Sequence, residues 1–275
     1  MFKGEVRIGL VGILSDFGLR DSYVAQMKAV ILSRSPSTTI VDISHGIERH
    51  NIDQGMFVLA SVTPYFPSGT IYLAVVDPGV GGSRRSLLLE TERSKFVGPD
   101  NGLLVLAAEK EGIVNVYELD ESRYTTNKIS STFHGRDIFA VAVGDIASGN
   151  APSDIASQIS DYVKPMIIKP KIRSNQIDAI ALHIDYFGNV VTNISQSIFQ
   201  RYEINFGYKM KIKVKAITKE IDFCKTYSDV ASGQLLATIG GHGYLELSIN
   251  QGNAAEYIDL KTGDKLLVQI VGLSV

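Results

Sequence analysis

A carboxylate and an arginine share one glycine-rich loop in the first third of the chain. Residues 71–76 form a continuous apolar run, which is followed by Asp77-Pro78-Gly79 and, later in the same loop, by Arg84. A carboxylate kept ionised by a nearby guanidinium can orient water and accept a proton. The alternative is that Asp77 only starts a turn that leaves a core strand, as an isolated Asp-Pro-Gly usually does. Because the loop also carries Arg84, the sequence favours a functional site.

Two further carboxylates follow another apolar run. Residues 8–14 are apolar, Ser15 and Asp16 follow them, and Asp21 precedes a segment with helical periodicity. In open α/β sheets ligands bind at the carboxyl ends of strands, where Asp16 and Asp77 are both expected. Asp21 could instead be only a helix cap. The Asp-Phe-Gly sequence at Asp16 does not indicate a kinase, because the upstream glycine-rich loop and the His-Arg-Asp motif with its asparagine are missing.

His134 is the third candidate for chemistry. It lies just before a predicted helix that runs through residues 139–147, which Ser131 or Thr132 is expected to cap. The positive end of a helix dipole disfavours a protonated imidazole. A single histidine is most often an ordinary hydrogen-bonded residue. This one stands in a polar loop, with no apolar stripe to explain it.

The elements that position these residues alternate between strand and helix. Strands are predicted at 8–14, 39–43, 71–76, 86–90 and 114–119, with helices after Asp21 and over 53–62 and 103–109. This alternation predicts a doubly wound α/β sheet for residues 1–163. Residues 164–178, with prolines and basic residues, read as a linker. Residues 179–275 read as a smaller, mostly β domain with strands at 179–184, 190–194, 209–216, 235–239, 244–249 and 265–271.

Composition excludes several classes of protein. The chain has 275 residues, 45% of them hydrophobic and 20% charged, with a net charge of −2. We therefore expect a globular protein that does not bind nucleic acid or an anionic membrane. No apolar run approaches the ~20 residues of a membrane-spanning helix, and no signal peptide is expected. The single cysteine, Cys224, rules out an internal disulfide and a cysteine-based metal cluster, and a cytoplasmic location fits best.

Several motifs along the chain carry a family resemblance. They are Ser15-Asp-Phe-Gly, Val76-Asp-Pro-Gly-Val-Gly with Arg84-Arg85, Pro99-Asp-Asn-Gly, Phe133-His-Gly-Arg-Asp, Asp185-Tyr-Phe-Gly-Asn and Gly243-Tyr-Leu-Glu. In this order they resemble the S-adenosyl-L-methionine hydroxide adenosyltransferases, which are relatives of the fluorinase and chlorinase that make 5′-halo-5′-deoxyadenosine. The resemblance covers nearly the whole chain.

The resemblance implies a fold and a reaction. The fold is an N-terminal α/β domain followed by a β-barrel-like C-terminal domain. The implied assembly is a homotrimer, with each site between the N-terminal domain of one subunit and the C-terminal domain of the next. The implied reaction hydrolyses S-adenosyl-L-methionine to adenosine and L-methionine, with no metal and no cofactor.

The resemblance also implies site residues. Asp77, Arg84 and His134 match the family's water-activating set. The substrate-binding residues it implies are Asp16 for the ribose hydroxyls, Asp21 and Asp185 near the methionine amino end, Asn189 and Tyr227 at adenine, Ala254 through its backbone, and Glu246.

Halogenation is the first alternative reaction, and the sequence argues against it. An ionised Asp77 at the nucleophile position would repel a halide, and Val80 and Gly135 stand where the halogenase pocket has hydroxyl side chains. Gly241 replaces the serine that holds the substrate carboxylate in the fluorinase. The second alternative is a non-catalytic module that binds adenosine or S-adenosyl-L-methionine, which would not need the Asp77, Arg84 and His134 set.

Overall fold

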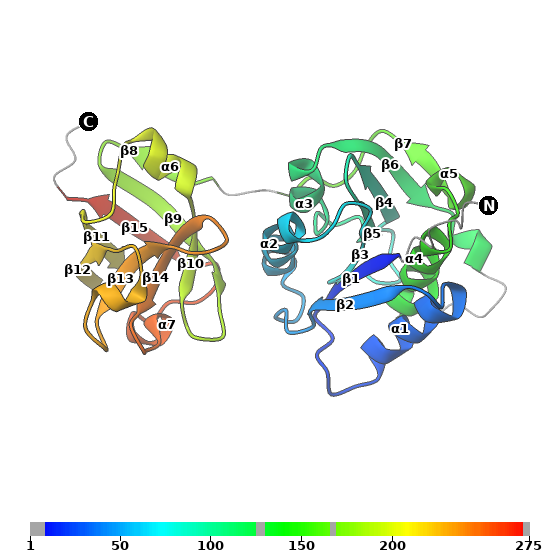
Figure 1. Cartoon of the computed structure of the whole chain (residues 1–275), viewed down its shortest axis with the longest axis horizontal. Helices are drawn as coiled ribbons and strands as arrows, with labels where there is room; N and C mark the ends of the chain where they lie inside the picture. Colours follow the sequence, from blue (N-terminus) through cyan, green and yellow to red (C-terminus); the bar gives the residue numbers. More distant parts are fainter. Residues whose placement is uncertain (1–8, 125–129, 166–168, 272–275) are drawn as a thin grey trace, which may run out of the picture. The chain divides into compact units, whose positions relative to one another are not determined.

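The chain folds into two compact units. The computed structural model describes residues 9–124, 130–165 and 169–271, and contacts divide the chain into units Met1–Pro165 and Met166–Val275 (Figure 1). The linker predicted over 164–178 includes residues 166–168, which lie outside the described residues. It also includes strand β8 (Lys171–Arg173) and the first residues of β9 (Gln176–Ile184).

A seven-stranded mixed sheet forms the centre of the N-terminal unit. Its order is β2 (Thr39–Ser44), β1 (Leu10–Ser15), β3 (Ile71–Val75), β5 (Lys95–Pro99), β4 (Ser86–Thr91), β6 (Ile113–Leu119) and β7 (Ala156–Ile159). The first four strands are parallel, while β4, β6 and β7 pair antiparallel. The predicted α/β class is confirmed.

Helices cover both faces of this sheet (Figure 1). Helices α1 (Tyr23–Arg34) and α4 (Ala140–Ala147) pack on one face, and α2 (Ile52–Val62) and α3 (Val105–Lys110) pack together on the other. Along β3, Leu73 and Val75 join the first core and Tyr72 and Ala74 the second. A strand buried on both faces needs apolar residues at every position, which explains the unbroken apolar run.

Short helical segments complete the unit. They are η1 (Thr63–Tyr65), η2 (Glu121–Tyr124), α5 (Pro152–Ile155) and a π-helical turn η3 (Gly135–Phe139) that leads into α4. The cap predicted at Ser131 or Thr132 is wrong: His134 occupies the N-cap position of this turn, without a side-chain capping hydrogen bond. The wider π turn moves the start of the helix to His134.

The C-terminal unit is a closed β-barrel. The strand order is β10 (Val190–Ser195), β14 (Tyr244–Ile249), β13 (Leu235–Ile239), β12 (Ile217–Phe223), β11 (Lys209–Val214), β15 (Lys265–Ile270), β9 and β8. Pairing of β9 with β10 closes the barrel. Helices α6 (Gln196–Arg201), α7 (Ala254–Tyr257) and η4 (Tyr227–Asp229) lie between the strands in sequence. The predicted mostly β, barrel-like domain is confirmed, but β12 and β8, which carry mostly polar residues, were not predicted.

Candidate active site

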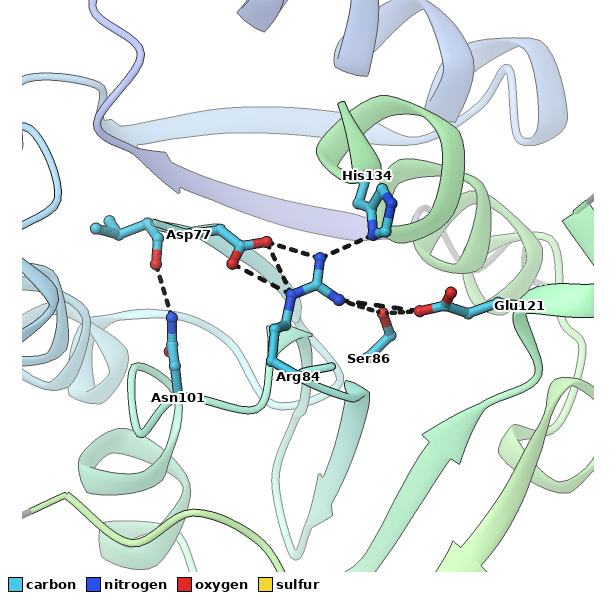
Figure 2. Close-up of polar contacts among 7 residues, drawn as sticks. Asp77, Arg84, Ser86, Asn101, Glu121 and His134 are labelled. Atoms are coloured by element: carbon cyan, nitrogen blue, oxygen red, sulfur yellow. Dashed lines mark hydrogen bonds and ion pairs between the residues drawn. The ribbon is translucent and has the colours of Figure 1, made fainter. Parts of the chain in front are cut away.

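Asp77 and Arg84 form a close, nearly buried ion pair. Arg84 Nη2 donates to Asp77 Oδ2 at 2.7 Å, and Nε donates to Oδ2 at 3.0 Å and to Oδ1 at 3.2 Å (Figure 2). Their side chains are 10% exposed for Arg84 and 5% for Asp77. Asp77 stands one residue beyond the apolar run, at the carboxyl end of β3, as the sequence predicts. The pair is one that can hold an ionised carboxylate at a strand end.

His134 joins the pair through Arg84. Arg84 Nη2 lies 2.8 Å from His134 Nδ1 (Figure 2). Arginine only donates, so Nδ1 accepts and the ring proton of the neutral imidazole is on Nε2. Burial, and after it the positive charge of Arg84, hold the pKa of His134 below its ordinary value of 6.5. The histidine is therefore neutral at neutral pH, with an Nε2–H available as a donor.

Three residues that the sequence did not single out support Arg84 on its far side. Arg84 Nη1 donates to Ser86 Oγ at 3.1 Å, and Ser86 Oγ donates to Glu121 Oε1 at 2.7 Å (Figure 2). The guanidinium carbon of Arg84 lies 5.2 Å from the centre of the Phe139 ring. These contacts fix the guanidinium plane, so that its Nε–Nη2 edge meets Asp77. Ser86 begins β4, and Glu121 follows β6, so only the antiparallel half of the sheet brings them here.

Two backbone contacts hold the loop that carries Asp77. Asn101 Nδ2 donates to the Val76 carbonyl oxygen at 2.9 Å (Figure 2). Gly81 has φ +75°, and a Cβ placed on it would come within 2.3 Å of the Ser131 carbonyl oxygen. Only glycine permits both this dihedral and this approach. The Asp77 loop and the loop before His134 therefore approach each other closely at Gly81.

Asp16 and Asp77 leave the sheet at the same edge. Strands β1 and β3 are parallel neighbours with Ser15 opposite Val75, and adjacent strands lie about 4.8 Å apart. Asp16 is half-buried, and its Oδ2 accepts from the His50 backbone N–H at 2.9 Å. Its second carboxylate oxygen has no hydrogen bond to a described residue.

A series of polar side chains runs from buried Ser15 and His45 to exposed Asp42 beside the Asp16 loop. Ser15 Oγ lies 2.7 Å from His45 Nδ1, and His45 Nε2 lies 3.1 Å from Asp42 Oδ1. The Gly18 N–H donates to the His45 carbonyl oxygen at 2.8 Å. The residue types are those of a nucleophilic triad, but Ser15 is 0% exposed. We infer that the series positions Asp16 rather than attacking a substrate.

Asp21 is exposed in the loop before α1. Ser22 is the N-cap residue of that helix, and it makes no side-chain capping hydrogen bond. Asp21 has no hydrogen bond or ion pair with another described residue, so the structure gives no support to the capping alternative.

In the barrel unit, Asp185 and Asn189 form a tight loop. Asp185 Oδ1 accepts from the backbone N–H groups of Phe187 and Asn189, both at 2.9 Å, and Oδ2 accepts from Asn189 Nδ2 at 2.8 Å. Tyr186 and Phe187 between them are 98% and 72% exposed. Asp185 therefore stabilises this loop, which presents two aromatic rings to the surface.

Tyr227 and Glu246 form one network. Glu246 is buried, and its Oε1 accepts from Tyr227 Oη at 2.8 Å and from Ser248 Oγ at 2.7 Å. His242 Nε2 lies 3.2 Å from Glu246 Oε2. Burial, and after it the hydrogen bond to Glu246, raise the pKa of Tyr227 to about 12. With both oxygens engaged, Glu246 fixes Tyr227 and His242 and leaves the half-exposed Tyr227 ring open to a ligand.

The structure does not place Ala254 at a surface. Ala254 is 0% exposed, begins α7 and packs in the barrel core. The expected contact between the Ala254 backbone and adenine stays a prediction. The exposed neighbours are Gly252 and Asn253.

Neither a metal site nor a membrane span stands out. Across the ranges that the structure describes, no three His, Cys, Asp or Glu side chains gather as metal ligands. Over the same ranges, every helix is too short or too polar to cross a bilayer.

The fold and the strand-end cluster define a two-domain class of protein, an α/β domain with an Asp–Arg–His site joined to a β-barrel domain. Family models assign this class. Residues 11–156 match the SAM hydroxide adenosyltransferase N-terminal domain and residues 179–267 the corresponding C-terminal domain. The chain belongs to the S-adenosyl-L-methionine hydroxide adenosyltransferase family.

Relatives cover nearly the whole chain. An (R)-S-adenosyl-L-methionine hydrolase of Methanocaldococcus jannaschii is 34% identical over 94% of this chain and 95% of its own length. A fluorinase of Actinoplanes sp. is 24% identical over 92% of this chain and 95% of its own length. A crystal structure of an uncharacterized conserved protein from Thermotoga maritima superposes with a TM-score of 0.90 at 33% identity, covering 94% of this chain and 99% of that one.

The neutral state of His134 predicts a pH dependence. The value of kcat/KM should be flat around neutral pH and fall at a pH below the ordinary histidine pKa of 6.5, when protonation of His134 puts a second cation beside Arg84. Because the unfolded chain takes up this proton first, the free energy of unfolding should also fall as pH drops through 6.5. The measurement is kcat/KM against pH for the wild type and for His134→Asn, whose amide oxygen still accepts from Arg84. An acid limb that is unchanged in His134→Asn would contradict the assignment.

Proposed function

We propose that this chain hydrolyses S-adenosyl-L-methionine to adenosine and L-methionine. The observation that carries the proposal is the Asp77–Arg84–His134 cluster at the carboxyl end of β3. Relatives at 34% and 32% identity that bear the name (R)-S-adenosyl-L-methionine hydrolase support it. On the same ground we propose that the (R)-sulfonium epimer is the preferred substrate.

The chemistry requires activation of water rather than of the leaving group. The C5′–S bond breaks with its electron pair on sulfur, which departs as the neutral thioether of methionine. Water oxygen forms the new bond to C5′, and one proton is released. Asp77 orients the water and takes on proton character, and Arg84 holds that carboxylate in place through its hydrogen bonds. Because a thioether needs neither a general acid nor a Lewis acid, we propose that no metal or cofactor takes part.

Substrate binding is proposed for the other residues at the same edge and on the barrel. Asp16 can accept from the two ribose hydroxyls, and Asp21 adds negative charge for the α-ammonium group. In the barrel unit, Asn189 offers an amide to adenine and Tyr227 a ring. Asp185 and Glu246 would act mainly by positioning Asn189 and Tyr227.

A homotrimer with shared sites is proposed for the assembly. The residues proposed to bind substrate come from both units of the chain. The rigid, exposed Tyr186 and Phe187 offer an aromatic contact for a second copy, a kind of residue that is enriched at protein interfaces. A cytoplasmic location is proposed because the single Cys224 fits a reducing compartment.

Product analysis tests the reaction. Purified protein incubated with S-adenosyl-L-methionine in halide-free buffer should form adenosine and methionine in equal amounts. Adding chloride or fluoride should leave adenosine as the main product, because Asp77 repels an anion and neither Val80 nor Gly135 has a hydroxyl group to replace the water around a halide. A main product of 5′-chloro- or 5′-fluoro-5′-deoxyadenosine would instead favour the halogenase alternative. No turnover with saturable binding would favour the non-catalytic module.

A further inference from the structure

The outer face of the barrel carries a cavity in addition to the residues discussed above. Strands β11, β15, β9 and β8 lie side by side in this order and line a cavity of about 640 Å³. Across these strands, Lys213 lies opposite Leu267, and Leu267 opposite Asp178. Asp178 in turn lies opposite Lys171. Residues in one row across a sheet point to the same face, so these side chains all border the cavity.

The cavity combines a basic rim with an apolar floor. Lys265 lies two residues before Leu267 on the same strand and opposite Ile180, which adds a second row on this face. Lys171, Lys213 and Lys265 are exposed, whereas Ile180 and Leu267 are half-buried. A ligand in this cavity would therefore meet ammonium groups around its edge and aliphatic side chains beneath it.

The protein balances only part of the positive charge around the cavity: Asp178, which also lines it, lies 3.7 Å from Arg173. Within the described residues, Lys171, Lys213 and Lys265 have no carboxylate oxygen within 4.0 Å. The lysines at the two ends of β11 differ. Lys209 pairs with Asp222 at 2.6 Å, and Lys215, at the end of the cavity, pairs with Asp259 at 2.9 Å.

The cavity thus gathers three lysines that have no ion-pair partner among the described residues. Three ammonium groups on one concave surface repel one another, and a polyanion would relieve that repulsion. A nucleic acid needs a longer basic track than one cavity supplies. The volume lies within the roughly 300–1,000 Å³ of small-molecule sites.

We propose that this cavity binds a phosphorylated small molecule of nucleotide size. Its phosphates lie against Lys171, Lys213 and Lys265, and its planar or apolar part lies over Ile180 and Leu267. The proposal is independent of the hydrolase reaction, because none of these residues belongs to the proposed active site.

Calorimetry on the full chain at low ionic strength tests the proposal. The probes are GTP, inorganic triphosphate and guanosine, since an adenine nucleotide could also enter the proposed active site. GTP should bind, triphosphate more weakly, and guanosine at least about tenfold more weakly than GTP, because it lacks the charge-assisted contacts. The double variant Lys213→Glu/Lys265→Glu should weaken GTP binding by about tenfold or more.

A charge-matched control separates a site from general attraction. Lys219 Nζ lies 5.4 Å from the centre of the Tyr257 ring and outside the cavity lining, so Lys219→Glu should change GTP affinity less than about twofold. Thermal melts establish that all variants are folded. The proposal would be overturned if Lys219→Glu lost as much GTP affinity as the double variant, or if the double variant lost none. It would also be overturned if neither GTP nor triphosphate bound. So would binding of a single-stranded oligonucleotide whose affinity grows with length, which would indicate a nucleic-acid surface instead.

Discussion

Asp77→Asn should lower kcat by about 10²–10⁴-fold and change KM little, because the amide cannot accept proton character from the attacking water. The substitution keeps the size of the side chain and leaves an oxygen to accept from Arg84. The loss should therefore appear in the chemical step and not in the fold. Steady-state kinetics with adenosine detection, together with a thermal melt, measure both.

A neighbouring aspartate supplies the control for that result. Asp161 pairs with Arg85, the next residue after Arg84, at 3.1 Å, and its side chain is 79% exposed. Asp161→Asn removes one carboxylate from an arginine pair without touching Asp77, so kcat should stay within about twofold of the wild type. If Asp77→Asn retained near-wild-type kcat, or if Asp161→Asn lost as much, Asp77 would not be the water-orienting group.

Asp16→Ala should raise KM by about 100-fold and lower kcat much less. Hydrogen bonds to charged groups contribute roughly 1.5–3 kcal/mol each, and the ribose diol can make two of them with one carboxylate. Part of that energy is regained when water fills the space, so we expect the lower end of the range. The measurement is KM and kcat for S-adenosyl-L-methionine, with binding of adenosine as a second readout.

The second variant at this position separates binding from structure. Asp16 also accepts from the His50 N–H at 2.9 Å. Asp16→Asn keeps an acceptor for that contact but loses the charge. It should therefore fold like the wild type and show an intermediate KM. Equal losses of kcat and KM in the Asp16 and Asp77 variants would contradict the separate roles given to the two carboxylates.

Local sequence was sufficient to predict where β3 ends, but not to predict β5 and β7. A strand buried on both faces is continuously apolar, so the position where the apolar run of β3 gives way to Asp77 could be read directly. Arg84 shares the loop, and the family resemblance added His134. The structure brings the three side chains together. The local sequence does not predict the contacts of Ser86 and Glu121 at this site, because only antiparallel pairing in the other half of the sheet brings them to Arg84.

In the barrel unit, two residues that were expected to bind substrate are buried, Glu246 and Ala254. Glu246 was expected to bind substrate, yet its oxygens are engaged by Tyr227, Ser248 and His242. Ala254 matches a contact residue by position but is 0% exposed. Burial and hydrogen-bond saturation are tertiary properties, and short turn motifs do not encode them. The π turn after His134 likewise could not be predicted from the sequence, because the same residues also fit an ordinary helix start.

The origin of the 5′ oxygen of adenosine tests most directly whether Asp77 orients water rather than attacking carbon. A single turnover of enzyme in excess over S-adenosyl-L-methionine, run in ¹⁸O-labelled water, should place the label in adenosine. Unlabelled adenosine, with ¹⁸O appearing in the Asp77 carboxylate by peptide mass spectrometry, would show that the carboxylate itself bonds to C5′ and would contradict the mechanism.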